Sequence, residues 1–142
     1  MTTREPAAIP EATVAAVVSE ISERMKNPKF AELAVGDFVQ SHPDAGRFVT
    51  AQAKALGGSE AVVHVIFHAQ VIAECFRKHG RTRIRPVSFA ALDRAAGENR
   101  LAALSQVEPA LADYIGSNVE APAEREAIAH ISLAIRDLSF PG

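Results

Sequence analysis

The segment from Ser59 to His79 constrains the fold more than any other part of this sequence. Its apolar residues recur at spacings of three and four, the period of an α-helix, and they cover more than half of the helical circumference. At a rise of 1.5 Å per residue the helix is roughly 30 Å long, about the width of a small domain. A helix with so broad an apolar surface needs neighbours on several sides, so we expect it to be the central element of the fold.

The rest of the chain predicts shorter helices packed around this one. Prolines and glycines separate stretches of helical period, because proline fits the first turn of a helix and glycine fits its end. Ser59 and Ser88 stand where N-caps are expected. The expected helices cover about 11–26, 28–41, 43–56, 59–79, 88–107 with an interruption near Gly97, 109–116 and 122–138. Strand patterns are nearly absent, so we predict an all-α fold: a compact single-domain bundle of six or seven helices over residues 10–142, preceded by a disordered tail of residues 1–9.

Composition narrows the class of protein further. The formal charge is −2, and the single cysteine, Cys75, excludes an intrachain disulfide and favours a reducing compartment. The first ten residues contain no apolar core of signal-peptide length. The most apolar stretch, residues 61–73, is shorter than the about 20 residues that a membrane span needs. We therefore expect a cytoplasmic protein that does not cross a membrane.

One flank of the long helix carries a row of polar and sulfur side chains. The row consists of His64, His68, Cys75 and His79. Histidines four residues apart on a helix can bind one metal ion or line a ligand pocket, although Cys75 lies roughly 10 Å along the axis from His68, too far to share that ion. Cys75 and His79 could form a second pair. The simpler interpretation is that these histidines mark the boundary of the apolar face, where they bond to the backbone and reach water. We predict no resident metal or cofactor and keep the histidine pocket as the alternative.

A cluster of positive charge follows the long helix. Five of the fifteen lysines and arginines fall within nine residues that contain no acid: Arg77, Lys78, Arg81, Arg83 and Arg85. Outside this segment ten cations face seventeen acids, a net charge of −7. Part of the cluster has a structural explanation, because cations stabilise the C-terminal end of a helix and can pair with the many acids elsewhere. In an extended chain Arg81, Arg83 and Arg85 would point to one side, where their planar guanidinium groups could bind carboxylates or phosphates through two hydrogen bonds.

These patterns favour an interaction domain over an enzyme. The sequence contains no glycine-rich phosphate loop, no nucleophile elbow and no carboxylate–histidine repeat of a di-iron bundle, so we predict no catalytic residues. We call residues 77–85 the arginine segment. The net charge of −7 outside this segment would repel a nucleic-acid backbone, which disfavours nucleic acid as the ligand. The expected function is a non-catalytic adaptor or regulator that binds an acidic protein partner through the arginine segment and could form a homo-oligomer.

Overall fold

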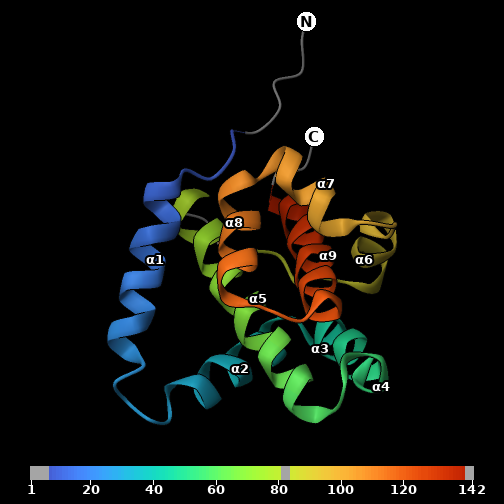
Figure 1. The fold of residues 1–142 in the computed structure, drawn as a ribbon, viewed down its shortest axis with the longest axis horizontal. Coiled ribbons are helices and arrows are strands. Elements are labelled where there is room, and N and C mark those ends of the chain that lie inside the picture. The colour runs from blue at the N-terminus through green and yellow to red at the C-terminus, as the bar shows by residue number, and fades with distance from the viewer. Residues whose placement is uncertain (1–6, 81–83, 140–142) are drawn as a thin grey trace, which may run out of the picture.

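The computed structural model of the protein describes residues 7–80 and 84–139. The described residues form nine helices and no strand, which confirms the predicted all-α fold with one long central helix (Figure 1). In chain order the helices are α1 (Glu11–Arg24), α2 (Phe30–Ser41), α3 (Pro43–Ala51), α4 (Ala53–Leu56), α5 (Ser59–Gly80), α6 (Phe89–Ala95), α7 (Arg100–Val107), α8 (Pro109–Asn118) and α9 (Pro122–Ser139).

The helix count in the described residues exceeds the expected six or seven because local backbone geometry divides two of the predicted segments. Gln52 leaves the helical conformation (φ −96°, ψ 9°) and separates α3 from the four-residue α4. Asn99 adopts a left-handed conformation (φ 51°, ψ 54°) directly before α7. Glu108 leaves the helical conformation (φ −140°, ψ 69°), because the following Pro109 disfavours that conformation at the preceding residue, and α7 and α8 separate at the boundary expected from the sequence. Ser88 accepts a hydrogen bond from the Ala91 N–H and caps α6, as predicted.

Helix α5 runs unbroken from Ser59 to Gly80 through the middle of the molecule (Figure 1). Helices α1, α2, α3 and α9 all pack against it, and α9 makes its most extensive contact. Ten of its residues are buried, and they lie on more than one side of the helix. This arrangement buries the apolar residues on several sides of α5, because each of these sides faces a different neighbour.

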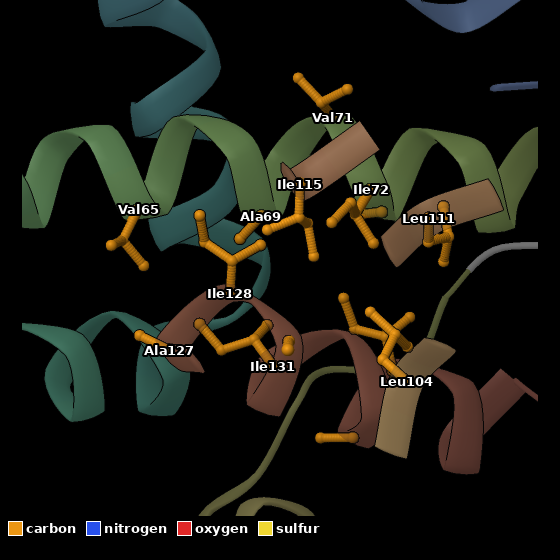
Figure 2. Close-up of a cluster of buried hydrophobic side chains, with 14 of the residues drawn as sticks. Val65, Ala69, Val71, Ile72, Leu104, Leu111, Ile115, Ala127, Ile128 and Ile131 are labelled. Atoms are coloured by element: carbon orange, nitrogen blue, oxygen red, sulfur yellow. The ribbon is translucent and has the colours of Figure 1, made fainter. Parts of the chain in front are cut away.

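The core lies where α5 meets α8 and α9 (Figure 2). Val65, Ala69 and Ile72 of α5 point toward Ile128 and Ile131 of α9 in this view, and these five residues are almost fully buried. Leu111 and Ile115 of α8 complete the cluster with Leu104 of α7, whereas Val71 points from α5 in another direction. The side chain of Val71 is also buried, which shows that α5 has apolar contacts away from the α9 side.

Within the described residues, α5 is the one helix long and apolar enough to cross a membrane, by length and composition alone. More than half of its most apolar window is buried inside the protein. The same properties are typical of the central helix of a bundle, and α5 occupies that position here.

The N-terminal segment enters the core earlier than expected. Residues 1–6 of the predicted tail lie outside the described residues, but Ile9 is 2% exposed and belongs to the hydrophobic core. Its N–H donates to Oε1 of Glu108 at 2.7 Å. The carboxylate of Glu108 is fully buried and also accepts from Nε of Arg136 at 3.1 Å. Ile9, the last residue of the predicted tail, is thus held by a buried acid 99 residues away.

Replacing Glu108 with glutamine should destabilise the fold through the loss of its charge. The amide oxygen can still accept from the Ile9 N–H, but the positive charge of Arg136, whose side chain is only 18% exposed, loses its carboxylate. Breaking a buried ion pair in this way should lower the free energy of unfolding by about 3 kcal/mol, measured by urea denaturation. The control is Glu98→Gln, at an exposed position, which should change the free energy of unfolding by less than about 0.5 kcal/mol. Equal stability of the two variants would contradict this role of Glu108.

Candidate functional site

The arginine segment divides into paired and unpaired cations. At the end of α5, Arg77 forms an ion pair with Glu74 of the preceding turn at 2.6 Å, and Lys78 pairs with Glu20 of α1 at 2.7 Å. The hydrogen bond and the charge of Lys78 lower the pKa of Glu20. Arg81 and Arg83 lie outside the described residues. Arg85 is exposed, and among the described residues it forms no ion pair.

Arg77 and Arg85 both line a groove of about 750 Å³. We call this hollow the arginine groove. Three elements line it: the end of α2 with the residue after it, the second half of α5, and the segment before α6. Its lining residues are Gln40, Ser41, His42, Gln70, Ala73, Glu74, Arg77, Ile84, Arg85 and Pro86. The elements that form the groove are distant in sequence, so the fold adds polar side chains that the sequence pattern did not connect with the arginines.

His42 is the most deeply buried polar side chain of the groove. It is 4% exposed, and its Nδ1 accepts a hydrogen bond from the Val87 N–H at 3.0 Å. Because Nδ1 is the acceptor, the proton of the neutral imidazole is on Nε2, where it is a hydrogen-bond donor. Burial lowers the pKa of His42 and favours this neutral form. The hydrogen bond also joins the end of α2 to the segment that carries Arg85, so His42 holds two walls of the groove together.

The histidine row separates into two parts in the structure. His64 and His68 contact each other, with their Nε2 atoms 3.1 Å apart and their rings nearly perpendicular. Nδ1 of His64 lies 2.5 Å from Oε1 of Glu124 in the first turn of α9, and Nδ1 of His68 lies 2.7 Å from the Tyr114 hydroxyl of α8. Burial and the charge of His64 lower the pKa of His68 to about 4. We call His64 and His68 the histidine pair.

Cys75 and His79 do not join the histidine pair. Cys75 is fully buried, and this burial, with a contribution from the charge of Glu74, raises the pKa of its thiol to about 12. A thiol in this state is protonated and behaves as a small apolar core residue rather than as a nucleophile or a metal ligand. His79 lies one turn further along α5. Among the described residues, no three histidine, cysteine, aspartate or glutamate side chains converge as a metal site.

Sequence reasoning missed the partners that other helices contribute to both sites. Tyr114 and Glu124 complete the surroundings of the histidine pair, and His42 and Gln40 line the arginine groove. The carboxyl group at Glu124 and the hydroxyl at Tyr114 have no characteristic spacing from the histidines, which are 60 and 46 residues away. Only the packing of α8 and α9 onto α5 brings them together.

The buried imidazole of His42 should contribute to the pH dependence of stability. In the unfolded chain His42 takes up a proton near pH 6.5, whereas burial lowers its pKa in the folded protein. The unfolded state therefore binds more protons as the pH falls below about 6.5, and the free energy of unfolding decreases. In the His42→Asn variant the amide oxygen can still accept from Val87, so this titration disappears while the hydrogen bond is kept. Urea denaturation between pH 7.5 and 5 should give a shallower slope for the variant, by up to about 1.4 kcal/mol per pH unit. Parallel curves would show that His42 does not titrate differently on unfolding.

Comparison with known proteins assigns no family to this chain. No family model, no curated protein and no solved structure matches it. Inferences about its function therefore rest on the residues of the arginine groove and the histidine pair.

Proposed function

We propose that this protein is a non-catalytic binding domain that holds an acidic segment of a partner protein in the arginine groove. The observation that carries the proposal is the position of Arg85. Its exposed guanidinium lies at the groove, unpaired within the described residues, while the neighbouring cations Arg77 and Lys78 have acidic partners on the protein's own helices. An arginine that lines this hollow and has no ion pair within the described residues is available for an external carboxylate.

The lining of the groove suits carboxylate groups. Arginine binds a carboxylate through two parallel hydrogen bonds, and these charge-assisted bonds are stronger than neutral ones. Hydrogen-bond donors come from other walls as well, since Gln40, Ser41 and Gln70 present side-chain amide or hydroxyl groups. Glu74, the one acidic residue among the described lining residues, already bonds Arg77 through the Nε and Nη2 atoms of that arginine. This pairing reduces the repulsion that Glu74 would exert on an acidic ligand.

The size of the groove and the charge of the protein favour a peptide over smaller or larger anions. A hollow of about 750 Å³ exceeds the volume of a single phosphate or carboxylate and lies within the range of ligand-binding sites. Nucleic acid fits poorly, because the rest of the chain carries a net charge of −7 that would repel adjacent phosphates. An acidic peptide places its charges only where the arginines are, and the same charges would accelerate its association.

The proposal predicts that the arginines of the segment determine binding. The probe is a fluorescently labelled peptide of alternating glutamate and serine, and binding is measured by fluorescence anisotropy at low and high salt. The Arg81→Ser, Arg83→Ser, Arg85→Ser triple variant should weaken binding at least about 10-fold, because each arginine lost removes charge-assisted hydrogen bonds. Its melting temperature should stay near that of the wild type, because Arg85 forms no ion pair within the described residues.

A matched control separates the groove from general charge attraction. The variant Lys29→Ser, Arg47→Ser, Lys54→Ser removes the same number of positive charges from exposed positions outside the groove. It should bind the peptide within about twofold of the wild type at 0.15 M salt, where distant surface charges are largely screened. Equal losses in both variants, unaltered binding in the arginine variant, or no binding by the wild type would each refute the proposal.

A third variant tests whether the α2 wall takes part. Gln40→Ala with Ser41→Ala removes two exposed polar side chains and no charge. Recognition in the groove predicts a few-fold loss of affinity, whereas binding by the arginine segment alone predicts none. The comparison therefore decides whether the ligand contacts the α2 wall of the groove or only the arginines.

A further inference from the structure

The histidine pair lies on the first half of α5, away from the arginine groove, and its contacts are unusually complete. His64 is half exposed, with 47% of its side chain accessible, whereas His68 is 7% exposed. Each ring has one nitrogen bonded to a side chain of another helix and the other nitrogen directed at its neighbour. The fold thus fixes two imidazoles so that their Nε2 atoms converge at 3.1 Å.

The partners of the Nδ1 atoms determine what the Nε2 atoms carry. The Glu124 carboxylate is an acceptor, so Nδ1 of His64 carries a proton and its Nε2 has a free lone pair in the neutral ring. The Tyr114 hydroxyl can donate to Nδ1 of His68, and Nε2 of that ring then carries the proton and donates to Nε2 of His64. When the hydroxyl instead accepts from Nδ1 of His68, Nε2 of that ring has a lone pair as well. In this second tautomer two lone pairs face each other at 3.1 Å, and they repel unless a positive species lies between them. A proton is one such species, and a metal ion is the other.

The distances suit a metal ion. Zinc binds histidine nitrogen at about 2.0–2.1 Å, so an ion equidistant from two nitrogens 3.1 Å apart sees them at an angle of about 100°, between the octahedral and tetrahedral values. Histidines four apart on a helix are a known ligand arrangement, and metal-binding histidines commonly donate their other N–H to a carboxylate or another oxygen. Glu124 and Tyr114 supply these oxygens from α9 and α8.

We propose that the convergent Nε2 atoms of His64 and His68, oriented by Glu124 and Tyr114, form a binding site for a single divalent transition-metal ion of the zinc class. Imidazole nitrogen favours zinc, copper and nickel over magnesium or calcium. The exposure of His64 lets water complete the coordination shell, so the ion keeps open positions. The bound ion links α5 to α8 and α9 through the oriented rings and stabilises the folded state.

The first test measures zinc binding to tag-free protein that has been treated with a chelator and dialysed. Isothermal titration calorimetry should detect one Zn²⁺ per chain, and the ion should raise the melting temperature. The His64→Gln variant should weaken binding at least about 100-fold and lose the thermal shift, because it removes one of two protein ligands. His64 is half exposed, so this variant should fold, which circular dichroism checks.

Two further variants distinguish the proposed site from other histidines and from nonspecific binding. Glu124→Gln keeps an oxygen beside Nδ1 of His64 but removes its charge, and loss of such an orienting partner weakens metal binding about 10–100-fold. His79→Gln removes the histidine closest in sequence to Cys75 and should leave zinc binding unchanged. Undetectable binding by the wild type at 0.1 mM Zn²⁺, equal binding by His64→Gln, or a loss confined to His79→Gln would each overturn the proposal.

Discussion

The structure depends on the burial of α5, a helix that is apolar over more than half of its circumference. Such a helix cannot lie on the surface of a bundle, so α1, α2, α3 and α9 surround it on different sides. Burial of apolar surface, at about 25 cal/mol per Å² removed from water, is the dominant favourable term in folding. Apart from α9, the other described helices have 14 residues or fewer, and helices of that length are marginal in isolation, so their stability depends on packing. Within the described residues α5 is thus the element to which the rest of the fold conforms.

The central position of α5 also explains where the candidate sites lie. Side-chain contacts join the first half of α5 to α8 and α9 through Tyr114 and Glu124. The second half of α5 lies beside α1, through the Lys78–Glu20 ion pair, and beside the end of α2. The histidine pair meets Tyr114 and Glu124 at the first contact, and the arginine groove opens beside the end of α2 at the second. Both sites combine one or two side chains of α5 with polar groups that another helix contributes. Neither site would exist if α5 were broken or displaced.

The sequence predicts the framework of this protein better than its sites. Helical periodicity, prolines and glycines locate α5 and most of the other helices, because these signals are local. Ile9 was assigned to a tail because its partner Glu108 is 99 residues away, and no local pattern reveals such a contact. The sequence also does not predict the break at Gln52 between α3 and α4, because glutamine is a good helix former and gives no local signal for a break. Of the polar row on α5, the structure keeps His64 and His68 together and buries Cys75 apart from them, while Arg81 and Arg83 lie outside the described residues.

Native-state hydrogen exchange tests the central position of α5 most directly. If α5 is the core of the fold, its amides from Val65 to Phe76 should exchange only when the whole protein unfolds. Their opening free energy should then equal the free energy of global unfolding from urea denaturation, and amides of α1 and α4 should exchange at lower free energies. Exchange of the α5 amides through local opening, at free energies below those of α9, would contradict the account.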